Sequence, residues 1–191
     1  MTILYEAVDV LHEDDLTALD NWHHEGVGGM SVLDGGGLAL ACVGSAQGRE
    51  GCQAFFRHDL PDPVCIDYEL TVCSQGGLVI NFVAMRGIHG EDLIADSGKL
   101  RRRTGCFGDY VAAQSDLQSY HVSVSRFNDK GEHTGTSNWR RNPGLILIGH
   151  GEDLVNTTGE PYQIRLIKDR ISLQLFVNGR SCGRRERDPR D

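Results

Sequence analysis

Alternation of apolar and polar residues near the end of the chain constrains the fold more than any other feature of the sequence. In YQIRLIK (162–168), Tyr162, Ile164 and Leu166 share one face, and Gln163 and Arg165 share the other. ISLQLFV (171–177) alternates in the same way, with residues 171, 173, 175 and 177 on its inward face. The letters KDR between the two stretches and NG after the second are turn signals. This region therefore predicts an antiparallel hairpin and then a further turn.

Short apolar runs separated by Gly, Asp and Asn clusters continue this pattern along the rest of the chain. The sequence has 24 glycines and 5 prolines, and the runs recur about every ten residues. Leu11–Leu19 is the exception to this strand pattern, as a candidate for a short helix of one or two turns. The pattern indicates an all-β sandwich or jelly roll, with strands at Gly29–Leu33, Gly37–Cys42, Gln53–His58, Val64–Val72, Gly77–Met85, Ser119–Ser125, Gly144–Gly149, Tyr162–Lys168 and Ile171–Val177.

Length and charge limit the class of protein. The 191 residues suffice for one domain with a real core, and no apolar run approaches the ~20 residues that span a bilayer. The net charge is −8 and the isoelectric point is near 5.4, which argues against nucleic acid as a partner. The N-terminal stretch MTILYEAVDVLHEDD has neither a basic region nor a long apolar region, so we expect no signal peptide and a cytoplasmic protein.

Signals for disulfides and metals are weak. The six cysteines include no CxxC pair, and without a secretory signal we expect them to be reduced. His89 and His150 lie beside carboxylates, yet their spacing does not fit a zinc site. We expect no cofactor, with a calcium ion held by loop carboxylates as the open alternative.

The run YHVSVSR (120–126) also alternates, and the side chains of its second face are polar and include a histidine. Residues 120, 122 and 124 form the apolar face, whereas His121, Ser123 and Ser125 form the other, with Arg126 at its end. A polar sheet face is either exposed to solvent or lines a ligand site. Histidine titrates near neutrality, so His121 is a candidate for a general base or a hydrogen-bonding partner of a sugar hydroxyl. The alternative is a histidine that a neighbour simply satisfies.

Two further groupings are candidates for ligand contacts. Glu91 and Asp92 precede an arginine run that contains Arg101 and Arg103, and these charges either brace a loop or line a site. In NWRRN (138–142), Asn138 and Arg140 suit sugar hydroxyls and uronate carboxylates. Trp139 suits either stacking on a pyranose ring or packing in the core.

The pentapeptide HGEDL occurs twice, at His89–Leu93 and at His150–Leu154. The flanking residues differ, so a duplicated unit is improbable and turn chemistry that arose independently is favoured. Each copy follows an apolar stretch and supplies a glycine and carboxylates to a loop. We favour the first copy as the ligand-site candidate because the arginine run follows it, and we keep His150 of the second copy as a candidate ligand contact.

A succession of motifs carries a likeness to a known family: GIHGEDL, LRRRTG, YHVSVSRF, NWRRNPGLILIGHG and PYQIRLIKDRISLQLFVNG. In this order they resemble the YesU-like family, the domain of unknown function 1961. The likeness continues more weakly upstream through Trp22 and Glu25-Gly26. The resemblance implies a concanavalin A-like jelly-roll β-sandwich of two antiparallel sheets. It also implies a link to the breakdown of pectic rhamnogalacturonan, in a superfamily of glycanases, polysaccharide lyases and lectins.

The end of the chain departs from the family pattern. Members continue past the equivalent of Asn178-Gly179 with further strands, whereas SCGRRERDPRD has no strand pattern. We therefore expect a single domain over residues 1–180, an irregular basic tail over 181–191 and a sandwich that lacks its last strand. A missing strand would leave an open sheet edge.

Three functions remain open at this point. An enzyme that acts on acidic, pectin-type saccharides by elimination would need a base and a group that neutralises the uronate, and His121, Arg126, Arg140 and Tyr110 are the candidates. A lectin-like binding protein would use the same groove without a base, and a truncated, inactive member is the third reading. In each active case the partner is an oligosaccharide or polysaccharide, with no nucleic acid or membrane, and a homodimer is allowed.

Overall fold

The alternating stretches near the end of the chain form the predicted hairpin. Strands β10 (Pro161–Lys168) and β11 (Ser172–Val177) pair antiparallel, with Leu166 opposite Leu175. The inward face of β11 is as predicted except at Ile171, which is 54% exposed. Ile171 lies in the turn before β11, where the Asp169 carboxylate accepts its backbone N–H and fixes the turn.

The computed structural model describes residues 9–42, 51–75, 78–128 and 130–186. These residues form two compact units. The first contains the chain up to Asp59 together with Arg103–Phe107, and the second contains Leu60–Arg102 and the chain from Gly108 onward. The single domain expected over residues 1–180 stays a prediction, because compactness alone does not say whether the units fold independently.

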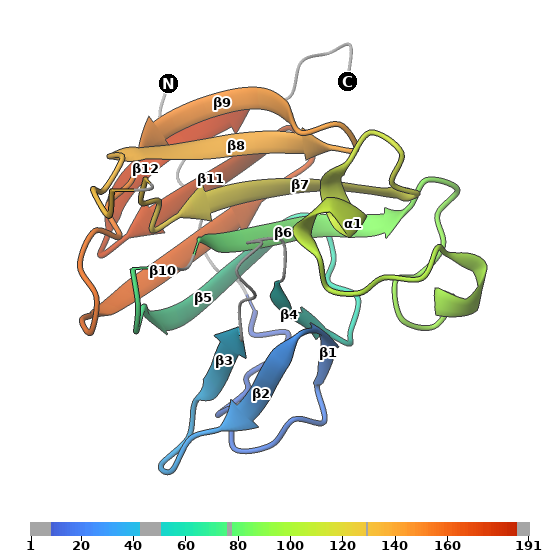
Figure 1. Cartoon of the computed structure of the whole chain (residues 1–191), viewed down its shortest axis with the longest axis horizontal. Helices are drawn as coiled ribbons and strands as arrows, with labels where there is room; N and C mark the ends of the chain where they lie inside the picture. Colours follow the sequence, from blue (N-terminus) through green and yellow to red (C-terminus); the bar gives the residue numbers. More distant parts are fainter. Residues whose placement is uncertain (1–8, 43–50, 76–77, 129, 187–191) are drawn as a thin grey trace. The chain divides into compact units, whose positions relative to one another are not determined.

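The second unit is a β-sandwich of two antiparallel four-stranded sheets (Figure 1), which confirms the predicted fold class. One sheet has the order β12-β11-β10-β5 and the other has the order β6-β7-β8-β9. The remaining strands of these sheets are β5 (Val64–Thr71), β6 (Val79–Gly87), β7 (Leu117–Val124), β8 (Thr136–Asn142), β9 (Ile146–Glu152) and β12 (Arg180–Glu186).

The core lies between the two sheets. Val122 of β7 and Trp139 of β8 contribute from one sheet, and Ile164 and Leu175 contribute from the other. Each of these side chains is almost completely buried. Burial of such apolar side chains between the sheets is the main stabilising contribution to a sandwich fold.

A strand continues past Asn178-Gly179, so the expectation of an irregular tail from residue 181 and of a missing strand there is wrong. Asn178 and Gly179 have φ of 50° and 76°, which suits the type I′ turn that favours a two-residue hairpin. β12 then pairs with β11. Its sequence RSCGRRE has one apolar residue facing the core, Cys182, and so shows no alternation. Residues 187–191 of the expected tail lie outside the described residues.

The first unit contains two antiparallel strand pairs. β1 (Trp22–Gly26) pairs with β4 (Cys52–Phe56), and β2 (Gly28–Val32) pairs with β3 (Leu38–Cys42). The helix considered at Leu11–Leu19 is absent from this described segment. The carboxylates of Asp14 and Asp15 accept the backbone N–H groups of Leu16 and Thr17, and such local bonds compete with a helix.

Two short helical segments connect β6 with β7, namely η1 (Ser97–Lys99) and α1 (Phe107–Val111). Every strand predicted from the sequence is present, whereas β1, β8 and β12 were not predicted. All six cysteines lie among the described residues, and none of them forms a disulfide there. Among the described residues, no helix combines the length and apolar character needed to cross a membrane.

Candidate functional site

Polar side chains gather on the outer face of the β6-β7-β8-β9 sheet. The register places His121 of β7 opposite Arg140 of β8, Ser123 opposite Asn138, and Asn138 opposite His150 of β9. Alternate residues of a strand share one face, so these side chains lie on the side opposite to the core residues. We call this set the polar face: Ser119, His121, Ser123, Asn138, Arg140, Asn142 and His150.

Exposure increases across the polar face from β7 to β9. Ser119, His121 and Ser123 are buried, so the second face of β7 is not the solvent-exposed surface that was one of the two alternatives from the sequence. Asn138 and Arg140 on β8 are half-buried, and His150 on β9 is exposed. Solvent therefore reaches the side chains of β8 and β9, and we call the buried polar residues of β7 the floor of the polar face.

His121 is held inside this floor. Its Nδ1 lies 2.9 Å from Nδ2 of Asn142, and its ring meets the Phe82 ring edge-on with centroids 5.2 Å apart. Burial, and secondarily the charge of Arg140, lowers the pKa of His121 from 6.5 to about 4. The imidazole is therefore neutral at physiological pH, and with so low a pKa it is a weak general base.

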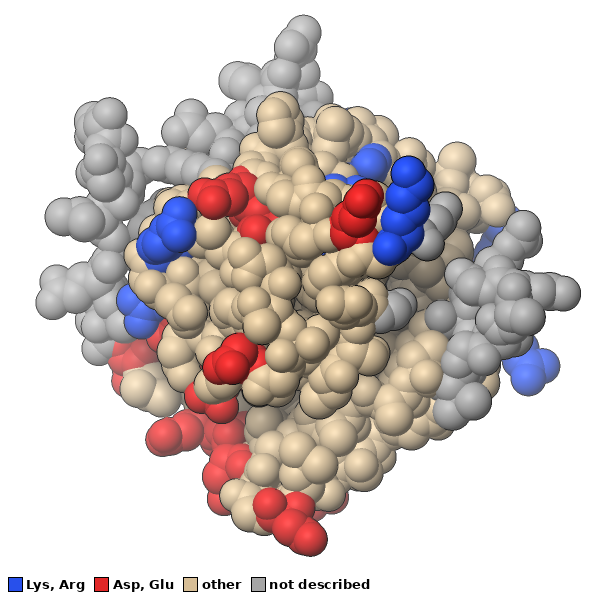
Figure 2. Space-filling view, turned by 60° about the vertical axis from the view of Figure 1, so that its left-hand side comes forward, with Lys and Arg blue, Asp and Glu red and all other residues tan. Residues whose placement is uncertain are grey.

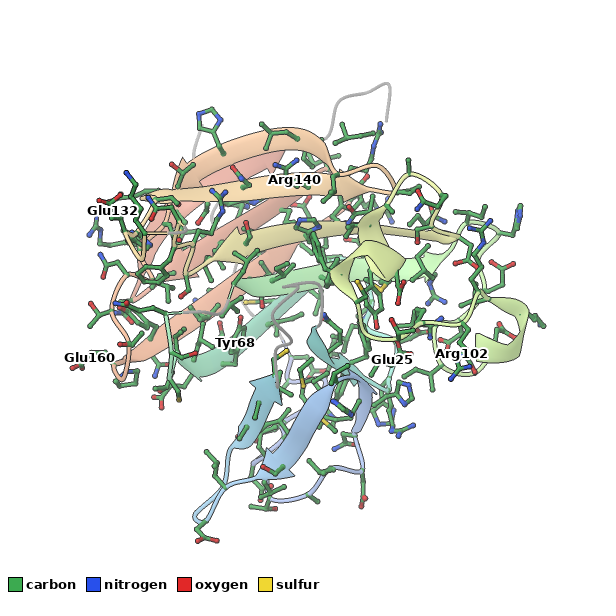
Figure 3. All side chains as sticks on the ribbon, viewed as in Figure 1. Glu25, Tyr68, Arg102, Glu132, Arg140 and Glu160 are labelled. Carbon is green, nitrogen blue, oxygen red and sulfur yellow. The ribbon has the colours of Figure 1, made fainter. Side chains whose placement is uncertain are left out.

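Arg140 is a cation without a carboxylate partner on the polar face. Its Nη1 donates a hydrogen bond to the backbone oxygen of Leu145, and no Asp or Glu of the described residues forms an ion pair with it. Figure 3 labels Arg140 on β8. Arginine presents several donors in a fixed fork, so donors remain for an acceptor from outside the chain.

On the outer face of the β12-β11-β10-β5 sheet, by contrast, an arginine is paired with a carboxylate of the neighbouring strand. Arg165 of β10 lies opposite Asp67 of β5, and its Nε and Nη2 donate to the two carboxylate oxygens at 2.7 Å each. Gln163 likewise donates to Glu69 on the facing strand. Charged groups also lie interspersed, and in places side by side, on the surface viewed in Figure 2. Arg140 thus differs from Arg165, although it shares with Arg101 and Arg126 a guanidinium that donates to a backbone oxygen rather than to a carboxylate.

The structure does not bring Arg126 together with His121. Arg126 follows β7 five residues after His121, about 16 Å along an extended chain. Its Nη1 donates to the backbone oxygen of Thr136, and its backbone N–H donates to Asp153. Tyr110, the third predicted catalytic residue, is fully buried in α1, with its ring centroid 6.1 Å from that of Phe82.

Trp139 is a core residue, which corrects its prediction as a ligand-stacking group. Its side chain is 1% exposed and packs between the sheets, where the indole contacts Gly151 and Gly183. The residue is odd-numbered in a strand whose even-numbered residues form the polar face. Its ring therefore offers no face to a sugar.

Glu91 and Asp92 brace the turn after β6, as the structural alternative predicted. Glu91 accepts the backbone N–H of His89, and Asp92 accepts those of Ile94 and Ala95. Neither carboxylate contacts the arginine run. Arg101 instead donates through its backbone N–H to Asp116 and through Nη1 to the oxygen of Gln114. These predicted ligand contacts therefore lack the shared site that their spacing suggested, and Arg102 is exposed on the loop before α1 (Figure 3).

Arg103 is part of a buried ion pair within the first unit. Its Nε and Nη2 donate to the two carboxylate oxygens of Glu25 at 2.8 and 2.6 Å. A Cβ at Gly105 would lie 1.9 Å from the Cα of Gly26, so both positions require glycine. The motifs Glu25-Gly26 and RTG (103–105) are thus two halves of one contact, which makes Arg103 structural.

Metal coordination has no support among the described residues, where no three His, Cys, Asp or Glu side chains are placed to hold an ion. His89 lies in the turn after β6 and His150 lies in β9, so the two histidines considered as metal ligands belong to different elements.

The sequence did not single out Ser119 or Phe82, and it grouped Asn142 within NWRRN without its place beside His121. Ser119 follows from extending the alternation of His121 and Ser123 by one step. Asn142 required knowledge that NWRRN is a strand. Phe82 required the pairing of β6 with β7, which places it opposite His121. The first had a local signal, whereas the other two depend on long-range register.

Comparison with known proteins agrees with this fold. The family model of the domain of unknown function DUF1961 matches residues 6–182. The uncharacterised protein YesU of Bacillus subtilis (strain 168) is 31% identical over 163 residues, which cover 83% of this chain and 70% of YesU. A crystal structure of a Bacillus subtilis protein of unknown function with a galectin-like fold superposes with a TM-score of 0.84 at 27% identity, covering 97% of this chain and 84% of that one. The chain belongs to the DUF1961 family and has a galectin-like, concanavalin-type β-sandwich fold.

Proposed function

We propose that this protein binds carbohydrate through the polar face and that Arg140 recognises the carboxylate of an acidic sugar unit. The observation that carries the proposal is the half-buried guanidinium of Arg140, which has no carboxylate partner in the described chain. A bidentate arginine–carboxylate contact is among the stronger polar interactions in proteins. The galectin-like fold of the solved relative supports a sugar as the ligand.

The neighbours of Arg140 suit the rest of such a ligand. Asn138 offers an amide with donors and an acceptor, and His150 offers an exposed imidazole. Leu147 lies opposite Arg140 on β9 and is 53% exposed, so it supplies apolar surface beside the polar groups. Sugar rings present hydroxyl groups and apolar C–H faces, and this combination matches both.

The first test measures binding of oligogalacturonate, an acidic pectin-type probe, by isothermal titration calorimetry. Arg140→Ala should weaken binding about 10- to 100-fold, as expected for losing a charge-assisted contact. The matched control is Arg165→Ala, which removes an arginine of the opposite outer face whose charge is already paired with Asp67.

Two results would count against the proposal. Wild-type protein that binds neither oligogalacturonate nor neutral pectic oligosaccharides would contradict a pectin-type carbohydrate ligand. Equal losses of affinity in Arg140→Ala and Arg165→Ala would show that Arg140 contributes only general charge.

Elimination of an acidic oligosaccharide is the second candidate function, favoured by one observation. His121 and Arg140 lie opposite each other in the register, so an arginine able to neutralise a uronate lies beside a neutral imidazole, the pairing that elimination needs. The low pKa of His121 weighs against it as the base. An absorbance assay for unsaturated uronates decides: product that disappears in His121→Ala supports the lyase, and binding without product supports the binding protein.

A further inference from the structure

Asn142 is the side chain that fixes the geometry of the buried floor. It is 3% exposed, and its Nδ2 donates to Ser119 Oγ at 2.8 Å and lies 2.9 Å from His121 Nδ1. Two residues earlier on the same strand, Arg140 donates to the oxygen of Leu145, in the turn that follows Asn142. One strand end and its turn therefore orient His121 and Arg140, two of the three ionisable side chains of the polar face.

The donor character of Asn142 Nδ2 restricts the state of His121. A neutral imidazole has one N–H donor and one acceptor nitrogen, whereas an imidazolium has donors on both. An amide NH₂ aimed at Nδ1 pairs only with an acceptor, so this orientation of the Asn142 amide, in which its buried Oδ1 has no partner among the described residues, requires an unprotonated Nδ1. The proton of the neutral ring is then on Nε2.

The groups that face His121 from other elements act in the same direction. Arg140 approaches from β8 with a positive charge, which disfavours a second cation beside it. Phe82 meets the ring edge-on from β6, and the ring centroid of Tyr110 in α1 lies 6.1 Å from that of Phe82. Apolar neighbours exclude the water that would stabilise an imidazolium.

We propose that Asn142 is a positioning residue, which holds His121 as a neutral imidazole with Nδ1 as the acceptor and so keeps Arg140 the main cation of the polar face. The inference rests on the proposed function for its consequence in binding. His121 then adds no positive charge of its own to the contact between Arg140 and an acidic sugar, wherever His121 stays neutral.

The test is nuclear magnetic resonance of the ¹⁵N-labelled histidine rings. In wild-type protein the His121 signals should show the Nε2–H tautomer and no protonation above about pH 5, since the pKa of His121 is lowered to about 4. Asn142→Asp replaces the donor by a carboxylate that accepts from Nδ1–H, so the titration of His121 should move upward by about 1 to 3 pH units.

Asn138→Asp is the matched control, because it adds the same charge to the same strand face opposite Ser123 rather than beside the His121 ring. It should move the His121 titration less than Asn142→Asp does. Equal shifts in the two variants, or an Nδ1–H tautomer in wild-type protein, would overturn the proposal. The wild-type tautomer needs no variant, so the proposal stays testable even where Asn142→Asp fails to fold.

Binding separates this inference from the proposed function. With His150 replaced by Ala, so that this second histidine of the polar face no longer contributes, the affinity for oligogalacturonate should be unchanged between pH 5.5 and 8, whereas adding Asn142→Asp should make the affinity pH-dependent in that range. A ring tautomer as predicted, with no binding of the probe, would leave Asn142 as a positioning residue and refute the ligand. Binding of the probe by wild-type protein with an Nδ1–H tautomer of His121 would support the carbohydrate ligand and refute the role of Asn142.

Discussion

The two copies of HGEDL have the same five residues and different structural roles. The first copy forms the turn after β6, where each carboxylate accepts backbone N–H groups from residues two or three positions away. These bonds are local, and the side chains of Glu91 and Asp92 are partly exposed. The first copy thus stabilises one turn.

The second copy makes long-range contacts within one sheet, with the chain that follows β7. Asp153 follows β9 and is buried, and its carboxylate accepts the backbone N–H groups of Ser125, Arg126 and Val155 at 2.9 to 3.2 Å. Nε2 of His133 lies 3.0 Å from the same carboxylate. One aspartate therefore fixes both ends of the β7–β8 connection against the end of β9.

The difference shows that tertiary contacts, rather than the pentapeptide, assign the role. Independent turn chemistry was the favoured explanation of the repeat, and the two copies indeed share no partner. The first copy was favoured as the site candidate because an arginine run follows it. In the structure the second copy is nearer to the candidate site, since His150 belongs to the polar face.

Replacing the aspartate of each copy should give the largest difference in the free energy of unfolding between the two copies. Asp153→Ala leaves several buried N–H groups without an acceptor and should lower the free energy of unfolding by about 3 to 5 kcal/mol. Asp92→Ala removes a local cap and should cost about 1 kcal/mol. Urea denaturation of both variants and wild-type protein measures the difference, and equal losses would contradict the distinction between local and long-range carboxylates.

The glycines of the two copies should differ by a smaller amount. A Cβ at Gly151 would lie 2.0 Å from the backbone oxygen of Cys182 on the facing sheet, so Gly151→Ala should cost about 3 kcal/mol. Gly90 has open space around a Cβ but a φ of 93°, so Gly90→Ala should cost about 1 kcal/mol of backbone strain.

Thermal unfolding checks this pair. Each kcal/mol corresponds to about 2 to 4 °C for a chain of this size, so the melting temperature of Gly151→Ala should fall clearly further than that of Gly90→Ala. A larger loss for Gly90→Ala would mean that the sheets separate readily near Gly151.

The sequence predicted strands correctly where one face of the strand is apolar and the other is polar. The β10–β11 hairpin was predicted because Tyr162, Ile164 and Leu166 alternate with polar residues. It failed for β8, whose sequence TSNWRRN has one large apolar residue directed at the core and polar groups on the outer face. A strand that lines a polar site loses the alternation by which strands are recognised.

The candidate site was predictable in part for the same reason. His121, Arg140, Asn138 and His150 were each named from the sequence, and the register of β7, β8 and β9 brings them to one face. Arg103 and Glu91 were grouped by proximity in sequence. Their partners, Glu25 and the backbone N–H of His89, follow from folding that no spacing rule contains.

The histidines of the two copies should give the smallest difference, and it concerns binding. His150 is an exposed member of the polar face opposite Asn138, so His150→Ala should weaken oligogalacturonate binding about 2- to 5-fold, the loss of one exposed hydrogen bond. His89 is exposed in the turn after β6, outside the polar face, so His89→Ala should bind as wild-type protein does. Calorimetric titration at one pH and salt concentration compares the three proteins. Unchanged affinity in His150→Ala, alongside a loss in Arg140→Ala, would confine the ligand to β8 and exclude β9 from the site.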